Sequence, residues 1–278
     1  MKNNVILITG CSTGIGRELA ERLTADGHTV IATARKPDTV SILGVAAVLA
    51  LDVTDAASIA AAVSETITRF GRIDMLINNA GYATRGAVED VPIAQVSAMF
   101  DVNVFGVMRM ITAVAPHMRA QKSGRIVTIG SIGGKVSIPV NGTYSATKFA
   151  VEALCDAARL ELAPFGIKMI LIEPGNIRSA FLERSLSLGN DTLHNPSSPY
   201  RPLYDRYAET SSRLRMHQGE PEAVYRAVKR VIESNRPKAR YLVAVPMATT
   251  IARYVPDGIR DRIFTKLFCS KNPTREKT

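Results

Sequence analysis

A tyrosine and a lysine four residues apart, Tyr144 and Lys148, are the side chains in this sequence best suited to proton transfer. On a helix this spacing is just over one turn, so the two side chains share a face. An ammonium beside a phenol favours the phenolate, and such a phenol can act as a general acid or base. Ser131 adds a hydroxyl upstream. Taken alone, the spacing is common on exposed helices, so its weight depends on the rest of the chain.

A glycine-rich segment near the N-terminus, residues 9–16, predicts a nucleotide-binding turn. The apolar residues 5–8 before it are typical of a buried parallel strand, and Ile15, Leu19 and Leu23 after it recur as in an amphipathic helix. In this context glycines let the backbone approach a pyrophosphate, and the helix N-terminus offers unpaired N–H groups. We therefore expect cofactor contacts from Gly10, Ser12, Thr13, Gly14, Ile15 and Gly16.

With both motifs, the chain resembles the short-chain dehydrogenase/reductase family over residues 5–232, and in particular its NADP-preferring branch with hydroxysteroid and retinol dehydrogenases. Further family motifs follow in the expected order. The resemblance implies contacts to the adenine, to the middle of the cofactor and to the nicotinamide carboxamide. The implied adenine contacts are Asp52 and Val53, and those to the middle of the cofactor are Asn79, Ala80 and Gly81. The implied contacts to the nicotinamide carboxamide are Pro174, Gly175, Ile177 and Ser179.

The resemblance also implies a role for each catalytic residue. Tyr144 would exchange a proton with the substrate oxygen, and Ser131 would stabilise charge developing on that oxygen. Lys148 would assist Tyr144 and bind the nicotinamide ribose, so both residues also belong to the cofactor site. Asn103 would hold a water that returns the proton through Lys148. The family often has threonine where Ser179 stands, but the hydroxyl is kept.

Charge after the second strand predicts the cofactor. The expected strand 28–34 ends at Ala34, where NAD-preferring members carry an acidic residue, and Arg35 follows immediately. A guanidinium can hold a phosphate through two parallel hydrogen bonds. We therefore expect NADP(H), with Arg35 on the 2′-phosphate, and treat NAD(H) as the less favoured alternative. Arg17 and Lys36 add positive charge but fit a solvated surface equally well.

The alternation of strand and helix patterns over residues 5–172 predicts a parallel α/β sheet with right-handed crossovers. We expect one Rossmann-type, doubly wound domain over residues 1–278, with helices on both faces of the sheet. The sequence shows no internal repeat, signal-peptide pattern or obvious linker. No run approaches the roughly 20 apolar residues of a membrane span, so we expect none.

The net charge of +10 raises nucleic acid or an anionic membrane as partners. The basic residues are spread along the chain without interleaved aromatics, so we expect no nucleic-acid partner. Cys11, Cys155 and Cys269 form no disulfide framework, which favours reduced thiols and a cytoplasmic location. None of them has metal-ligand spacing, and we expect no required metal.

Two segments predict how a substrate is enclosed. Residues 177–220 are rich in leucine and tyrosine and contain three prolines, which is typical of a lid over the nicotinamide end of the cleft. We expect a lipophilic ketone, aldehyde or secondary alcohol, with Ile138 and Val140 on the opposite wall, although packing explains any single residue as well. In the basic extension 247–278, a helix bearing Ile259, Ile263 and Leu267 should pack on the body or on a partner subunit. Contact with a membrane surface is less favoured.

Family members commonly pair through two long helices, expected here at about 94–120 and 144–165, so we expect a homodimer or homotetramer. Two functions remain open. One is an oxidoreductase, and the other is a nucleotide-sensing binding protein with little catalytic turnover. The complete set of Ser131, Tyr144, Lys148 and Asn103 favours the enzyme.

Overall fold

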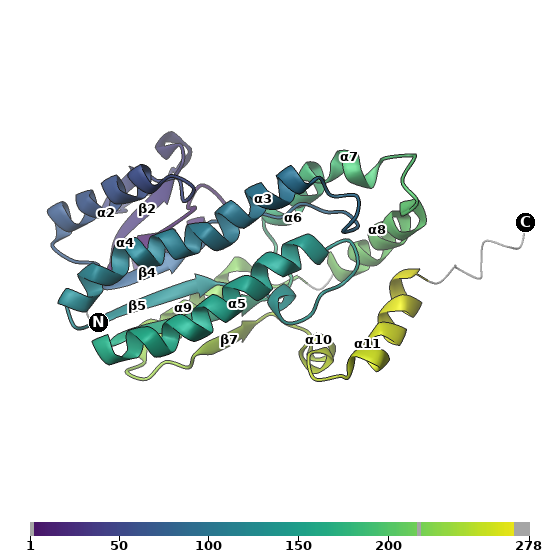
Figure 1. The fold of residues 1–278 in the computed structure, drawn as a ribbon. Helices are drawn as coiled ribbons and strands as arrows, with labels where there is room; N and C mark the ends of the chain where they lie inside the picture. Colours follow the sequence, from purple (N-terminus) through teal and green to yellow (C-terminus); the bar gives the residue numbers. More distant parts are fainter. Residues whose placement is uncertain (1–2, 216–217, 270–278) are drawn as a thin grey trace, which may run out of the picture.

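The structure, a computed structural model, describes residues 3–215 and 218–269, and seven strands of this part form one parallel sheet (Figure 1). The spatial order is β3-β2-β1-β4-β5-β6-β7, and every neighbouring pair is parallel. The strands are β1 (Val5–Ile8), β2 (Thr29–Ala34), β3 (Ala47–Ala50), β4 (Met75–Asn78), β5 (Gly124–Ile129), β6 (Ile167–Pro174) and β7 (Arg240–Val243). The order reverses direction between β1 and β4, where such sheets bind ligands.

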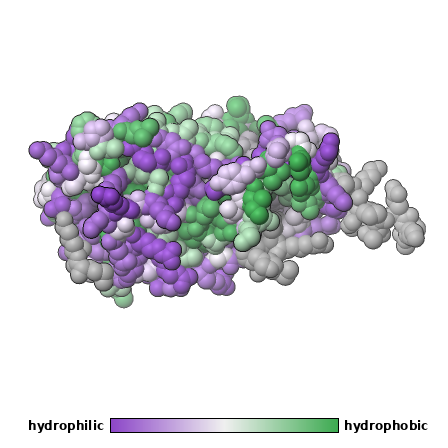
Figure 2. Space-filling view, turned by 90° about the horizontal axis from the view of Figure 1, so that it is seen from below, coloured by the Kyte–Doolittle hydropathy of each residue, from purple (hydrophilic) through white to green (hydrophobic). Residues whose placement is uncertain are grey.

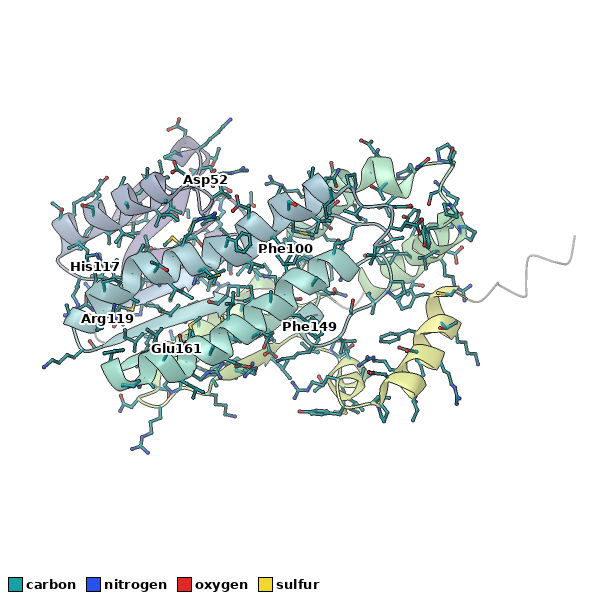
Figure 3. All side chains as sticks on the ribbon, viewed as in Figure 1. Asp52, Phe100, His117, Arg119, Phe149 and Glu161 are labelled. Atoms are coloured by element: carbon teal, nitrogen blue, oxygen red, sulfur yellow. The ribbon has the colours of Figure 1, made fainter. Side chains whose placement is uncertain are left out.

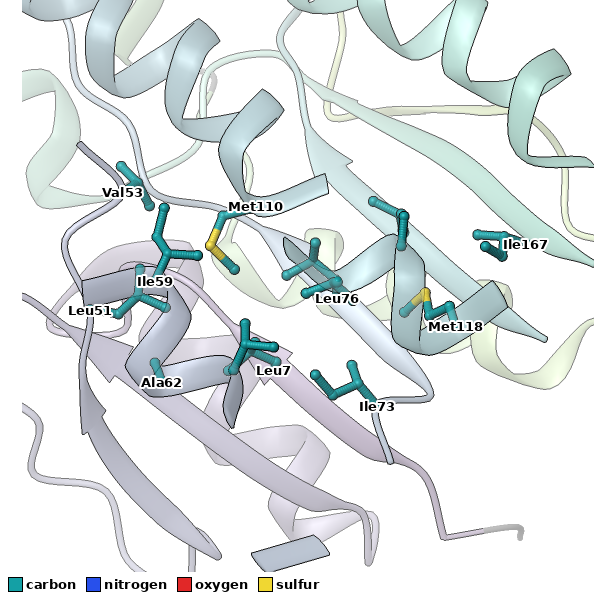
Figure 4. Packing of buried hydrophobic residues seen from close by; sticks show 14 of the residues in the cluster. Leu7, Leu51, Val53, Ile59, Ala62, Ile73, Leu76, Met110, Met118 and Ile167 are labelled. Atoms are coloured by element: carbon teal, nitrogen blue, oxygen red, sulfur yellow. The ribbon is translucent and has the colours of Figure 1, made fainter. Parts of the chain in front are cut away.

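Alternation along the strands assigns the two faces of the sheet, because successive side chains point to opposite sides. Leu7 packs in one apolar cluster, whereas Ile6 and Ile8 pack in the other. Figure 4 shows the first cluster around Leu7, Leu76 and Met110. On that face lie α2 (Ala56–Phe70), α4 (Gly106–Ala120) and α5 (Gly142–Leu162), and on the other lie α1 (Gly14–Ala25) and α9 (Pro221–Glu233). Helices on both faces confirm the predicted doubly wound fold.

The helix expected at 94–120 consists of α3 (Ile93–Phe100), a π-helical turn η2 (Asp101–Phe105) and α4. Within the described residues it alone has the length and apolar composition of a membrane span. However, 44% of its apolar window is buried inside the protein. Met110, Val114 and Met118 are fully buried in the cluster over the sheet. Packing on the sheet therefore accounts for the apolar character of this helix.

The outer face of α5 is apolar and exposed. Phe149, labelled in Figure 3, is 46% exposed and Leu160 is 75% exposed, whereas Leu162 is buried in the core. On α4, Met108 borders a shallow hollow of about 400 Å³ between α2 and α4, together with Phe105 of the preceding turn. The surfaces expected to pair two subunits thus carry exposed apolar side chains.

The remaining helices form a separate layer beyond the carboxyl ends of the strands. They are α6 (Ala180–Leu188), α7 (Asn190–Leu193), α8 (Arg201–Arg215), α10 (Met247–Ala252), α11 (Asp257–Phe264) and the π-helical turn η5 (Thr265–Cys269). An apolar cluster joins the body, α7, α8 and η5 through Val140, Leu193, Tyr204 and Phe268. Residues 216–217 of the expected lid and 270–278 of the expected extension lie outside the described residues.

The described part of the extension packs on the lid and the body through its aromatic side chains. Phe264 and Phe268 enter the apolar cluster with α8, whereas Ile259, Ile263 and Leu267 stay about half exposed. Figure 2 views the molecule from the side of α10 and α11 and shows hydrophobic surface among hydrophilic residues there. This helix is apolar on two sides, and burying the larger aromatic side chains removes more apolar surface from water.

Candidate active site

A glycine-rich turn between β1 and α1 brings the backbone close to the end of β4. Gly10 and Gly14 have φ angles of 73° and 60°, which suit glycine far better than other residues. A Cβ atom at Gly10 would lie 3.0 Å from Ala80 Cα. Ser12 and Ile15 are half-buried in and after this turn. The turn therefore lies at the point where the strand order reverses.

The N-terminus of α1 is suited to an anionic group. Thr13 precedes the helix in an extended conformation and makes no side-chain capping hydrogen bond. The first backbone N–H groups and the helix dipole are thus available to a phosphate. Gly16 serves packing instead, because a Cβ atom there would lie 2.3 Å from the Gly10 carbonyl oxygen.

Thr9, which no motif spacing singles out, fastens this turn to β4. Its hydroxyl accepts hydrogen bonds from the backbone N–H groups of Asn79 and Ala80, each at 3.0 Å. In return, Asn79 Nδ2 donates to the carbonyl oxygens of Thr9 and Gly10, each at 2.9 Å. The next residue, Gly81, lies against Asn103, since a Cβ atom at Gly81 would be 3.1 Å from Asn103 Oδ1. The residues expected beside the cofactor therefore also shape its turn.

Asp52 (Figure 3) and Val53 (Figure 4) follow β3, in the loop leading to α2. Asp52 Oδ1 accepts hydrogen bonds from the backbone N–H and the hydroxyl of Thr54, at 2.9 and 2.8 Å. Burial acts to raise the pKa of Asp52, but these bonds and the Arg35 guanidinium outweigh it and hold the pKa below its ordinary value. The carboxylate is therefore charged at neutral pH and can accept a hydrogen bond from an adenine amino group.

Arg35 directly follows β2 and is exposed. Within the described part of the chain it makes no hydrogen bond or ion pair. Arg17, by contrast, donates to Glu21 at 2.8 Å. Of these two arginines, Arg35 is the one whose donors remain available to an added phosphate, and it lies on the Asp52 side of the glycine-rich turn.

Ser131, Tyr144 and Lys148 meet around the short 3-10 turn η3 (Ile132–Gly134) and the first turns of α5. A Cβ atom at Gly133 would lie 3.3 Å from Ser131 Oγ and 3.5 Å from Tyr144 Cε1. Lys148 Nζ lies 5.8 Å from the centroid of the Tyr144 ring and donates to the Ile129 carbonyl at 2.9 Å. Tyr144 and Lys148 are 7% and 8% exposed, so the ammonium is largely desolvated beside the phenol.

Asn103 lies in the turn η2 and joins the β4 loop to α5. Its Oδ1 accepts from the Tyr82 N–H at 3.0 Å, and its Nδ2 donates to the Tyr82 carbonyl and to Thr147 Oγ1 at 2.8 and 3.1 Å. Both amide hydrogens are thereby used. Thr147 precedes Lys148 on α5, so Asn103 supports the position of Lys148. A π-helical turn at this place is typical of functional sites.

Pro174 ends β6, and the loop that follows carries Gly175, Ile177 and Ser179 towards α6. A Cβ atom at Gly175 would lie 2.3 Å from the Ala244 carbonyl oxygen, so this position requires close backbone approach. Ser179 Oγ accepts from the Phe181 N–H at 3.4 Å and begins α6. A Cβ atom at Gly14 would be 3.4 Å from Ser179 Cβ, which brings this loop to the glycine-rich turn.

The structure thus gathers the sequence-predicted residues along one edge of the sheet, with Asp52 and Arg35 at the β2–β3 end and Ser131, Tyr144 and Lys148 at the β5–β6 end. An extended dinucleotide fits this arrangement, with its phosphates at the glycine-rich turn in the middle. Among the described residues, no group of three or more His, Cys, Asp or Glu side chains could hold a metal ion. Independence from metal remains a prediction.

A buried cluster of charges lies next to Lys148 on α5 and behind Ser131 and Tyr144. Glu152, one turn after Lys148, forms ion pairs with Lys135 at 2.7 Å and Arg240 at 2.8 Å. Arg240 also pairs with Glu173, the residue before Pro174, at 3.0 Å. One oxygen of Glu152 and one of Glu173 are buried without a hydrogen-bond partner in the described part of the chain. The pKa of Glu173 is raised, mainly by burial and secondly by the charge of Glu152. Lys135 and Arg240 act in the opposite direction but do not outweigh these two causes.

The Glu173→Gln variant should gain stability relative to the native protein as the pH rises. A carboxyl whose pKa is raised by folding contributes stability below its ordinary pKa and loses it as the pH rises through the raised value. Glutamine mimics the protonated form, keeps an oxygen for Arg240 and does not titrate. Urea unfolding from about pH 4 to about pH 8 measures the difference between the two free energies of unfolding. The free energy of unfolding of Glu173→Gln minus that of the native protein should rise with pH. If this difference stayed constant or fell, the raised pKa of Glu173 would be contradicted.

The Thr9→Val variant should lose stability and bind nucleotide more weakly. Valine matches threonine in shape but leaves the N–H groups of Asn79 and Ala80 without their acceptor, at a cost of about 1–3 kcal/mol in the free energy of unfolding. Thr39→Val is the matched control, because the Thr39 hydroxyl donates to a carbonyl on the exposed surface. Chemical denaturation of both variants measures the effect, and equal stabilities would remove Thr9 from this role.

Comparison with known proteins agrees with this geometry. The family model for short chain dehydrogenase matches residues 4–187. The 3-ketodihydrosphingosine reductase of Bacteroides thetaiotaomicron is 35% identical over 263 residues, covering 93% of this chain and 96% of that protein. Human 17-beta-hydroxysteroid dehydrogenase type 1 is 36% identical over 271 residues, covering 92% of this chain and 80% of that protein.

Solved structures show the same likeness. A short-chain dehydrogenase from Streptomyces avermitilis superposes with a TM-score of 0.77 at 31% identity, covering 95% of each chain. A short chain dehydrogenase from Burkholderia cenocepacia, in complex with NADP, superposes with a TM-score of 0.73 at 25% identity, covering 97% of this chain and 99% of that one. The chain therefore belongs to the short-chain dehydrogenase/reductase family of oxidoreductases, which act on CH–OH and C=O groups.

Proposed function

We propose that this protein is an NADP(H)-dependent oxidoreductase that transfers hydride between the nicotinamide and a lipophilic ketone, aldehyde or secondary alcohol, with Tyr144 as general acid/base. The observation that supports this most is the grouping of Ser131, Tyr144 and Lys148 at the end of the sheet next to the glycine-rich turn. The cofactor supplies the hydride when bound. The chain supplies orientation, proton transfer and a desolvated surrounding.

Each side chain has the hydrogen-bonding capacity that its proposed role requires. The Tyr144 hydroxyl donates its proton to the carbonyl oxygen during reduction and takes one from the alcohol during oxidation. Ser131 Oγ accepts the Gly133 N–H at 3.0 Å, which leaves its own hydrogen for the substrate oxygen. Lys148 donates one N–H to Ile129, leaving two for the nicotinamide ribose, and its charge stabilises the Tyr144 oxygen after that oxygen has given up its proton.

Asn103 acts through the position of its neighbours. Its amide hydrogens are donated to Tyr82 and Thr147. A relay water could therefore bind Asn103 only by donating a hydrogen bond to its Oδ1. We infer that Asn103 holds the turn η2 and α5 in register, and that the water relay through Lys148 depends on this register.

The cofactor site favours NADP(H). The glycine-rich turn and the N-terminus of α1 would hold the pyrophosphate, and Asp52 and Val53 the adenine. Arg35 would bind the 2′-phosphate, supported by its exposed guanidinium and by the absence of an acidic residue at Ala34. The Burkholderia relative that superposes on this chain was solved with NADP, which supports the same cofactor here.

The lid segment (residues 177–220) supports a substrate with an apolar body. Phe181 of α6 lies 5.8 Å from the Tyr144 ring, so the segment begins directly against the catalytic tyrosine. Leu186, Leu193 and Tyr207 continue its apolar surface. Two relatives are named for a hydroxysteroid and a ketodihydrosphingosine, and a lipophilic substrate of this kind would fit here.

We also infer a single domain over residues 1–278, and a homodimer or homotetramer formed through the exposed faces of α4 and α5. The described part of the extension, residues 247–269, packs on the lid through Phe264 and Phe268. Cysteine chemistry supports a cytoplasmic location. Cys11, Cys155 and Cys269 are free, and burial raises the pKa of both the Cys11 and the Cys155 thiol to about 12. Such thiols are inert to disulfide exchange near neutral pH.

Replacing Tyr144 with phenylalanine should lower kcat about 10²–10⁴-fold, because the proton donor is lost while the ring is kept. NADPH oxidation against a panel of hydrophobic ketones first identifies a substrate. The affinity of the variant for NADPH, followed by fluorescence, should change by only a few fold. Tyr254→Phe is the matched control, since Tyr254 is 73% exposed and its ring contacts the Arg253 guanidinium, 4.6 Å from the ring centroid. Undiminished turnover in Tyr144→Phe would contradict the mechanism, and NADPH binding without turnover of any ketone would favour a nucleotide-sensing protein.

Replacing Arg35 with alanine should weaken NADP(H) binding by about 1.5–3 kcal/mol and change NAD(H) binding much less, because only NADP(H) carries the 2′-phosphate. Titration calorimetry with both cofactors measures the two losses. Arg69→Ala serves as the control, because Arg69 is an exposed arginine at the end of α2 that pairs with Glu65. Equal losses for both cofactors would remove Arg35 from the 2′-phosphate role.

A further inference from the structure

Arg85 is a buried cation beside Tyr144 for which the described residues provide no counter-charge. The residue is 6% exposed, and its guanidinium carbon lies 5.7 Å from the centroid of the Tyr144 ring. Its Nε donates to Ser185 Oγ on α6 at 3.2 Å. Among residues 3–215 and 218–269, no carboxylate pairs with it, and neither of its terminal nitrogens donates a hydrogen bond.

A buried guanidinium in this state is costly for the folded protein. The group carries five N–H donors, and the neutral Ser185 hydroxyl takes one of them. The ring of Tyr144 offers partial compensation through its face. The free-energy cost of removing a charged group from water is much larger than the stabilisation from one neutral hydrogen bond and one ring contact. Neither terminal nitrogen is among the buried side-chain atoms that lack a partner in the described chain, so both stay accessible and can donate to an acceptor that comes within reach.

The acidic residues nearest in sequence are already engaged elsewhere. Glu89 accepts a hydrogen bond from the Tyr200 hydroxyl at 2.6 Å, and Asp90 accepts one from Ser198 Oγ at 2.5 Å and another from Tyr204. These carboxylates hold the lid segment to the body. They are not the partners of Arg85, although they follow it by only a few residues.

The backbone of Arg85 is held where the body meets the lid. A Cβ atom at Gly189, between α6 and α7, would lie 2.6 Å from the Arg85 carbonyl oxygen. The next residue, Gly86, donates its N–H to the Val140 carbonyl at 3.1 Å, and Ala87 donates to the Tyr204 hydroxyl at 3.0 Å. Because both sides of the loop are fastened, Arg85 is kept beside Tyr144 and under the lid.

We propose that Arg85 forms an anion-binding subsite in the substrate cleft, so that the preferred substrate is an amphiphilic keto or hydroxy compound bearing a carboxylate, sulfate or phosphate. The anionic oxygens accept hydrogen bonds from the Arg85 guanidinium while the carbonyl oxygen meets Tyr144 and Ser131. The apolar body of the substrate lies against the lid. This proposal rests on the oxidoreductase function proposed above and names its substrate class.

The test uses the full-length protein with NADPH and pairs of methyl ketones. Each pair has a terminal carboxylate or its methyl ester, and the ketone and the terminal group are separated by chains of increasing length. The measured quantity is the ratio of kcat/KM for the acid to kcat/KM for the ester. In the native protein this ratio should exceed one by about tenfold to a hundredfold at the best chain length, and it should fall as salt is added.

Three variants separate the subsite from other roles. Arg85→Met keeps the length and removes the charge, so its ratio should fall to about one, whereas Arg85→Lys should keep part of the preference. Ser185→Ala should reduce the ratio by freeing the guanidinium from its present orientation. Arg178→Met is the matched control on the exposed surface, where Arg178 pairs with Glu220, and should keep the native ratio.

A ratio near or below one in the native protein at every chain length would overturn the proposal, even if Arg85→Met does not fold. The proposal would also be overturned if Arg85→Met shifted the pH profile of kcat/KM equally for acid and ester and left their ratio unchanged. Arg85 would then act through Tyr144. Reduction of the esters that is lost in Tyr144→Phe would leave the oxidoreductase function intact in either case. If the native protein reduced neither the acids nor the esters, or reduced them equally well after Tyr144→Phe, the oxidoreductase function itself would be contradicted.

Discussion

The hydrogen bond from the Lys148 ammonium to the Ile129 carbonyl, at 2.9 Å, is the contact on which the proposed chemistry of this site depends. It ties α5 to the end of β5 and holds a cation where little water can reach it. In such surroundings a charge acts more strongly on a neighbouring oxygen than it does in water. Tyr144 lies one turn before Lys148 and Glu152 one turn after it, so a single helix face carries the phenol, the ammonium and the carboxylate of the charge cluster behind them.

The two ends of the cleft use different physical means. At the glycine-rich turn, recognition rests on backbone N–H groups, and Thr9 and Asn79 keep that backbone in place through hydrogen bonds of 2.9–3.0 Å. At the substrate end, the surface is mostly apolar and one buried arginine, Arg85, interrupts it. An apolar wall cannot orient a flexible substrate by itself, whereas one charge at a defined distance from Tyr144 can. Under the proposed function, the lid would therefore supply affinity for an apolar body, and Arg85 would align it.

Local patterns predicted the parts of the fold that depend on neighbours in sequence. The strand at residues 5–8 and the helix expected at 144–165, found as α5 (Gly142–Leu162), agree because apolar runs and one-turn spacings are local signals. The order of the motifs predicted which loops meet at the sheet edge. Arg85 and Ser185 are 100 residues apart, and no spacing rule links them. The hydrogen bonds of Thr9 were not predicted for a related reason, since its partners lie 70 and 71 residues away on the β4 loop.

A crystal structure of the complex with NADP⁺ tests the central claim most directly. The account predicts that the nicotinamide ribose hydroxyls lie within hydrogen-bond reach, about 2.6–3.2 Å, of Lys148 Nζ, with the Tyr144 hydroxyl facing the space above the reactive ring carbon. It also predicts that the phosphates lie on the glycine-rich turn. A nucleotide bound away from this turn, or a nicotinamide whose ribose contacts neither Lys148 nor Tyr144, would contradict it.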